Sequence, residues 1–115
     1  MPDEQEITKG HYLINEGEEP GGMYFVIEGQ FEATMKKGDG EIVIGKISKG
    51  ELVGEMSFLD EEPRCASVRA ISDSVVKVIP ENRFKEFFNN QPSWYQALVK
   101  TLLERLRRAN KRVKI

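Results

Sequence analysis

The residues best suited to chemistry lie in the segment 50–68, GELVGEMSFLDEEPRCASV. Gly54 and Glu55 end a strand-like stretch, and one short helical turn over 56–59 follows them, whose unpaired N–H groups can hold an anion. Arg64 stands nine positions after Glu55 and is followed by three small residues, Cys65, Ala66 and Ser67. An arginine among small residues leaves space for a phosphate held by two parallel hydrogen bonds.

These groups together define the kind of ligand that the segment could hold. An ionised Glu55 only accepts hydrogen bonds, so it would repel a bare phosphate but bind a hydroxyl. The segment therefore predicts a ligand with one anionic phosphate beside a free hydroxyl, a pair that a 3′,5′-cyclic nucleotide carries. Two other interpretations stay open. Arg64 could be a surface arginine paired with Asp60, Glu61 or Glu62, and Glu55 could cap the turn that follows it.

Short strands separated by glycines must position this segment. All ten glycines lie between residues 10 and 54, and the runs between and after them are rich in Val, Ile and aromatic residues, as half-buried strands are. The expected strands are Tyr12–Ile14, Met23–Glu28, Phe31–Met35, Ile42–Ile47, Ala66–Ile71 and Ser74–Ile79. Asp39-Gly40 predicts a hairpin turn. Many short antiparallel strands at this spacing indicate a sandwich, a jelly roll or a barrel.

Two helices are expected after Pro80. Residues 81–89 place Phe84, Phe87 and Phe88 on one helical face, and Pro92 opens a longer helix over 92–112. The longer helix carries an apolar stripe in heptad rhythm, formed by Tyr95, Val99, Leu102, Leu106, Ala109 and Val113. This stripe could pack on the strands, but the helix is long enough for us to expect a homodimer through it. Trp94, Phe87 and Phe88 are predicted to seal the helices against the strands.

Length and composition indicate one soluble domain. The chain has 115 residues, of which 39% are hydrophobic and 31% charged. No apolar run approaches the roughly 20 residues that a membrane span needs, and the acidic, polar start is not a secretory signal. The single cysteine excludes an internal disulfide and agrees with a cytoplasmic location. We expect Cys65 to be a small, partly buried filler.

The charge is divided unevenly along the chain. From residue 100 onward seven basic residues face only Glu104, a balance of +6, so the first 99 residues carry −8 of the total of −2. Such a basic segment could contact nucleic acid or an anionic surface. It has no interleaved aromatic residues and no nucleic-acid-reading motif, so the solvated face of a helix is the favoured interpretation.

The sequence contains no catalytic or metal-binding pattern. A metal-dependent jelly roll of the cupin kind needs two or three histidines with a carboxylate, and this chain has only His11. A Ser/His/Asp set, a CxxC pair, a phosphate-binding loop of the Walker type and zinc-ligand spacing are also missing from the sequence. We therefore expect no catalysis and no metal.

The segment GEMSFLDEEPRCA resembles the phosphate-binding cassette of the cyclic nucleotide-binding domain family, which includes the catabolite activator protein, the regulatory subunits of cyclic-AMP-dependent kinase and the nucleotide-gated channels. Gly54-Glu55 with Pro63-Arg64-x-Ala66 is the specific part of the likeness. Upstream positions have similar spacing, and they are Gly10, Asn15-Glu16-Gly17-Glu18, Met23-Tyr24, Gly29 and Gly50. The resemblance covers about residues 7 to 112.

The resemblance implies a mainly β fold with C-terminal helices in one domain over 1–115. An antiparallel β-roll (a double-stranded β-helix jelly roll) over 7–80 would contain the cassette at 50–68, and a short helix at 81–89 and a long lid or dimerisation helix at 92–112 would follow. The ligand would be cAMP or cGMP, with Glu55 on the ribose 2′-OH and Arg64 on the cyclic phosphate. Further implied ligand-binding positions are Val53, Gly54, Met56, Ser57, Cys65 and Ala66 in the cassette, Ala33, Ile44 and Gly45 beside the nucleoside, and Arg105 and Arg108, with Ala109 or Asn110, near the base.

Four departures from the family pattern limit what it implies. Cys65 replaces the usual Ser, Thr or Ala, and a thiol is a weak donor, so preference for adenine or guanine stays open. Gly22 stands where an aspartate is common, and only six residues precede Ile7 where a helix is usual. The chain ends where the activator protein begins its DNA-binding motif, so we expect no DNA-binding domain in this chain. Two sources of the output stay open: an effector protein in trans, or a larger protein of which this chain is a piece. The alternative function is a ligand-free β-roll that serves as a dimerisation or docking scaffold.

Overall fold

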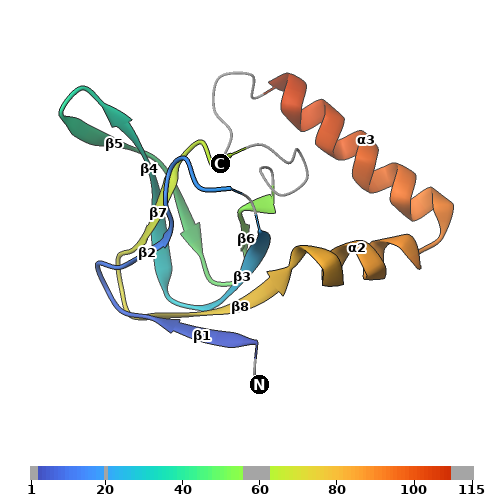
Figure 1. Cartoon of the computed structure of the whole chain (residues 1–115), viewed down its shortest axis with the longest axis horizontal. Helices are drawn as coiled ribbons and strands as arrows, with labels where there is room; N and C mark the ends of the chain where they lie inside the picture. Colours follow the sequence, from blue (N-terminus) through green and yellow to red (C-terminus); the bar gives the residue numbers. More distant parts are fainter. Residues whose placement is uncertain (1–2, 20, 56–62, 110–115) are drawn as a thin grey trace.

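The computed structural model describes residues 3–19, 21–55 and 63–109. The described residues form eight strands and two helices (Figure 1). The strands are β1 (Glu4–Ile7), β2 (Tyr12–Ile14), β3 (Gly22–Glu28), β4 (Gln30–Lys37), β5 (Gly40–Ser48), β6 (Leu52–Val53), β7 (Ser67–Ala70) and β8 (Ser74–Pro80). The helices are α2 (Glu81–Asn89) and α3 (Ser93–Ala109). All six predicted strands are confirmed, whereas β1 and β6 were not predicted.

The strands form two antiparallel four-stranded sheets. The first has the order β1-β8-β3-β6 and the second the order β2-β7-β4-β5. Apolar residues from both sheets make one core, formed by Ile7, Ile14, Val26, Phe31, Ala33, Ile47, Val53, Val68, Ala70 and Val76. Full burial of a Val or Phe side chain stabilises a fold by about 1.5–3 kcal/mol. The mainly β fold with C-terminal helices is therefore confirmed as a β-roll.

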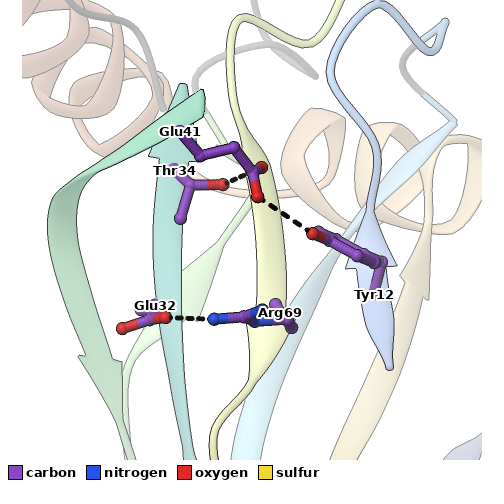
Figure 2. A network of polar contacts seen from close by, with 5 residues as sticks. All are labelled: Tyr12, Glu32, Thr34, Glu41 and Arg69. Carbon is purple, nitrogen blue, oxygen red and sulfur yellow. Dashed lines mark hydrogen bonds and ion pairs between the residues drawn. The ribbon is translucent and has the colours of Figure 1, made fainter. Parts of the chain in front are cut away.

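The face of the second sheet opposite the core carries a polar network across all four strands (Figure 2). Along β4, Phe31 and Ala33 enter the core while Glu32 and Thr34 join the network. The Glu32 carboxylate accepts a hydrogen bond from Arg69 Nη2 at 2.7 Å, and the Glu41 carboxylate accepts one from Thr34 Oγ1 at 2.9 Å. Tyr12 on β2 also donates to Glu41, at 3.3 Å. These bonds satisfy the polar face and fix which side of the sheet meets the core.

Helix α2 follows β8 directly, and α3 follows α2 after a short connection. Within α2, Phe84 and Phe88 stack with their ring centroids 5.7 Å apart. The described part of α3 ends at Ala109, so the predicted extension to residue 112 lies outside the described residues. Among the described residues α3 makes no extensive contact with any strand, and Figure 1 shows it turned back from the end of α2. Neither described helix is long and apolar enough to cross a membrane.

The predicted aromatic seal is wrong for two of its three residues. Trp94 is 68% exposed and Phe87 is 62% exposed, and only Phe88 is half-buried. Trp94 instead meets Tyr95 edge-on, with the ring centroids 5.9 Å apart. Trp94 is exposed because it lies on α3, which makes no extensive contact with a described strand. Phe87 lies on α2 and lines an open groove between that helix and the first sheet, so its ring stays exposed.

Candidate functional site

Arg64 occupies the centre of the predicted site and is buried. Its side chain is 6% exposed, which excludes the surface-arginine interpretation. Nη1 donates to the carbonyl of Gly54 and Nη2 to the carbonyl of Gly22, both at 2.7 Å. A guanidinium has five N–H groups, so three remain, and these have no hydrogen-bond partner among the described residues. Arg64 is therefore fixed in place by two backbone carbonyls while it keeps donors for an anion.

Gly54 allows this position of Arg64. Its φ of +88° lies in the left-handed region that favours glycine. A Cβ atom at this position would lie 2.7 Å from Nη1 of Arg64 and 3.3 Å from the Cδ1 atom of Ile14. Any larger residue would therefore push the guanidinium out of its place.

Glu55 is half-buried, and no hydrogen bond or ion pair joins its carboxylate to another residue in the described part of the chain. Burial raises its pKa, while its own backbone N–H and the positive charge of Arg64 act in the opposite direction. Burial also lowers the pKa of Arg64, while the charges of the nearby Tyr24, Glu18 and Glu55 act to raise it. No hydrogen bond or ion pair joins Glu55 to Arg64 among the described residues. The two groups can therefore bind different parts of one ligand.

The other predicted positions divide into three groups. Ala33 and Val53 are buried in the core, Ile44 packs against it, and Ala66 is also buried. Gly45, which pairs with Ala33 across β4 and β5, and Cys65 are half-buried. The Cys65 thiol is free, with Sγ 3.8 Å from the carbonyl oxygen of Pro63. Met56, Ser57 and the acidic residues Asp60, Glu61 and Glu62 lie outside the described residues, as does Asn110.

Arg105 and Arg108 are not held beside the rest of the site. Both are exposed on α3, and Arg108 Nε lies 3.5 Å from a carboxylate oxygen of Glu104, one helical turn away. Among the described residues, no hydrogen bond or ion pair joins either arginine to Arg64 or Glu55, and α3 makes no extensive contact with a strand. Their role stays a prediction.

Sequence reasoning missed the groups that hold Arg64. The carbonyls of Gly22 and Gly54 receive its side chain, and the loop 15–18 holds its backbone. Arg64 N donates to the Glu18 carbonyl and Gly17 N donates to the Arg64 carbonyl, each at 2.8 Å. The glycine in Asn15–Glu18 was the available signal, because φ at Gly17 is +90°. Apart from such a glycine, the residue types of a sequence do not indicate which backbone group a side chain will bond to.

Two cavities do not include Arg64 or Glu55 in their lining. An apolar groove of about 540 Å³ runs between α2 and the first sheet, lined by Phe25, Lys77, Val78, Ile79, Arg83, Phe84 and Phe87. A polar pocket of about 280 Å³ on the second sheet is lined by Tyr12, Asn15, Glu16, Lys36, Glu41 and Ser67. Across the described ranges, no group of three or more His, Cys, Asp or Glu side chains could hold a metal ion.

The structure is an antiparallel roll that holds a buried arginine, Arg64, and a half-buried carboxylate, Glu55. The family model for the cyclic nucleotide-binding domain matches residues 4–91, so the chain belongs to the cyclic nucleotide-binding domain family. The resemblance seen in the cassette is thereby confirmed.

Three known proteins illustrate the relationship. The lysophospholipase NTE1 of Coccidioides immitis (strain RS) is 27% identical over 103 residues, which are 89% of this chain and 6% of that protein. The cAMP-bound form of the EAL enzyme Bd1971 is 30% identical with a TM-score of 0.77, covering 93% of this chain and 29% of that one. The catabolite activator protein of Thermus thermophilus is 27% identical with a TM-score of 0.78, covering 93% and 51%. This chain thus spans between 6% and 51% of the length of these three proteins.

Proposed function

We propose that this chain is a regulatory module that binds cAMP or cGMP and catalyses no reaction. The observation that carries the proposal is the pair formed by Arg64 and Glu55. Arg64 is buried, and three of its N–H groups have no partner among the described residues. Glu55 is half-buried, and no hydrogen bond or ion pair joins its carboxylate to another described residue. Structures similar to this chain include cAMP-bound and cGMP-bound forms of Bd1971, at 30% and 29% identity, which supports the same ligand class here.

The nucleotide enters between the roll and the cassette with its phosphate toward Arg64. The free N–H groups of Arg64 donate to the cyclic phosphate, and the Glu55 carboxylate accepts from the ribose 2′-OH. The backbone near Gly54 and Ala66 completes the phosphate site, while Ala33, Ile44 and Gly45 border the nucleoside. Ligand charge compensates the burial of Arg64, and the ribose hydroxyl supplies the partner that Glu55 lacks.

The response to ligand is a movement of α3, which closes over the base with Arg105 and Arg108 on it. An exposed apolar stripe on α3 also supports a homodimer, because Tyr95, Leu102 and Leu106 are 40%, 54% and 40% exposed. An effector protein in trans receives the signal. A single free cysteine fits a reducing compartment, and we place the protein in the cytoplasm.

Calorimetric titration of cAMP and cGMP into the parent and Arg64→Ala tests the proposal. We expect Arg64→Ala to cost about 2–5 kcal/mol, or on the order of 30- to 5000-fold in affinity, because the phosphate loses its charged partner. Arg64→Lys keeps the charge without the planar fork and should lie between the two. Arg69→Lys, on the opposite face of the second sheet, is the matched control and should bind like the parent. Equal affinities for the parent and both Arg64 variants, with folding checked by thermal unfolding, would contradict the mechanism.

The second candidate function is a ligand-free dimerisation or docking scaffold. The observation that favours it is the engagement of two Arg64 N–H groups by the carbonyls of Gly22 and Gly54, a contact that stabilises the roll without any ligand. A scaffold would show no thermal shift with millimolar cAMP or cGMP, whereas a binding module gains stability as RT ln(1 + [L]/Kd).

A further inference from the structure

The main chain of Arg64 is held by the loop 15–18. Both polar backbone atoms of Arg64 bond to it, the N–H to Glu18 and the carbonyl to Gly17, each at 2.8 Å. The loop is also closed on itself, because Glu18 N donates to the Asn15 carbonyl at 3.1 Å and the Asn15 N–H donates to the Glu18 carboxylate. It is therefore a compact turn that sets the position of the Arg64 backbone.

Two contacts fasten this turn to the second sheet. Glu16 N donates to Oγ of Ser67 at 2.9 Å, and Glu16 Oε1 accepts from the backbone N–H of Lys36 at 3.1 Å. Ser67 is 6% exposed and is the first residue of β7, three positions after Arg64. Glu16 and Ser67 both line the polar pocket of the second sheet. The turn is thus anchored on β7 through Glu16, the residue that precedes Gly17, and Gly17 bonds to the Arg64 carbonyl.

We propose that Ser67 is a positioning residue for the nucleotide. The Ser67 hydroxyl holds the backbone of Glu16 and so fixes the turn 15–18. The turn in consequence holds the backbone of Arg64 where the guanidinium meets the phosphate. This inference rests on the proposed function. Ser67 does not touch the ligand in this arrangement and acts through the backbone of Arg64. Loss of the hydroxyl would loosen the turn and lower the fraction of molecules with Arg64 in place.

The test is Ser67→Ala, read by calorimetry with cAMP and by amide hydrogen exchange. We expect affinity to fall about 3- to 10-fold, the effect of losing one neutral hydrogen bond. Exchange at the amides of Gly17 and Arg64 should accelerate, because those N–H groups close the contact between turn and cassette. Ser67→Thr keeps the hydroxyl and should restore both affinity and protection. In an Arg64→Ala background, Ser67→Ala should cause no further loss of affinity.

Ser74→Ala is the matched control. Ser74 is 3% exposed on β8, and its hydroxyl donates to the Ser72 carbonyl at 2.8 Å, away from the turn 15–18. It should change thermal stability but not cAMP affinity. An equal affinity loss in Ser74→Ala, or parent-like affinity and exchange in Ser67→Ala, overturns the inference. Failure of the parent itself to bind cAMP or cGMP would instead overturn the proposed function, so the two failures are distinguishable.

Discussion

At the scale of single residues, Arg64 serves the fold and the site at once. Its guanidinium bonds to the start of β3 and to the residue after β6, so it ties the cassette to the first sheet. An arginine stays positively charged at neutral pH even though burial lowers its pKa. The molecule therefore keeps a buried positive charge whose remaining donors have no partner among the described residues, a cost that the proposed ligand would offset.

Glu55 gives the prediction in which stability and function change in opposite directions. Because burial raises its pKa, the charged form destabilises the free protein at neutral pH. Glu55→Gln should raise the free energy of unfolding at pH 7 by about 0.5 kcal/mol. The same change removes the charged acceptor for the ribose hydroxyl and should weaken cAMP binding about 10-fold. Urea unfolding and calorimetry measure the two effects.

The pH dependence of the unfolding free energy tests whether the raised pKa of Glu55 causes the gain in stability of Glu55→Gln. A carboxyl with a raised folded-state pKa stabilises the protein fully below the unfolded value, near 4.5, and this contribution is lost as pH rises through the folded value. The advantage of Glu55→Gln should therefore shrink to nothing as pH falls toward 4. Glu86→Gln, at an exposed position on α2, is the control. A pH-independent gain, or the same gain in the control, would contradict the assignment.

The types of the key site residues could be predicted, but their partners could not. Gly54, Glu55 and Arg64 were singled out by residue type and spacing: a glycine and a carboxylate end one strand-like stretch, and an arginine among small residues follows nine positions later. The carbonyl of Gly22 and the turn 15–18 could not be foreseen, because every residue has a backbone carbonyl and only the fold selects one. Burial of Arg64 likewise depends on which strands surround it.

At the scale of elements, the prediction was accurate where side-chain pattern decides the structure. The helix 81–89 and the predicted strands are present, since glycines, prolines and apolar alternation mark their ends. β1 was missed because only Ile7 of its four residues is buried, and β6 because it has two residues. The position of α3 was beyond reach: an apolar stripe indicates that something covers it, not what covers it.

Movement of α3 makes a prediction for limited proteolysis. Trypsin cleaves after Lys100, Arg105 and Arg108, all of which are exposed on α3. If nucleotide closes this helix over the site, cleavage requires the open form and should slow about tenfold at a cAMP concentration ten times Kd. Cleavage after Lys36 and Lys37, exposed near the turn between β4 and β5, should not change. Equal protection of both regions, or none on α3, would contradict closure.

At the scale of the whole molecule, acidic and basic residues are distributed unevenly between the roll and α3. The roll carries the acidic excess of the chain, and α3 carries basic residues beside its apolar stripe. The seam of the stripe on α3 is formed by Tyr95, Val99, Leu102 and Leu106, and in a heptad pattern Leu98 and Leu103 occupy the positions beside it. A parallel pair of these helices would therefore bring leucines, and not like charges, together beside the seam. The arrangement is suited to pairing two copies through α3 while the acidic rolls stay apart.

Leu102 lies in the middle of this stripe, is 54% exposed, and supplies the test of assembly. We expect light scattering to give the mass of two chains for the parent at micromolar concentration. Leu102→Lys should weaken the dimer about 100-fold or more, because each copy of the substitution places an ammonium in the apolar seam. Leu52→Lys is the control, since Leu52 is 45% exposed on β6, outside α3. A parent that scatters as a single chain would contradict pairing through α3, and dissociation by both substitutions would locate the contact on another surface. If only Leu102→Lys dissociates the dimer, measuring its cAMP affinity then shows whether pairing and closure compete for the same helix.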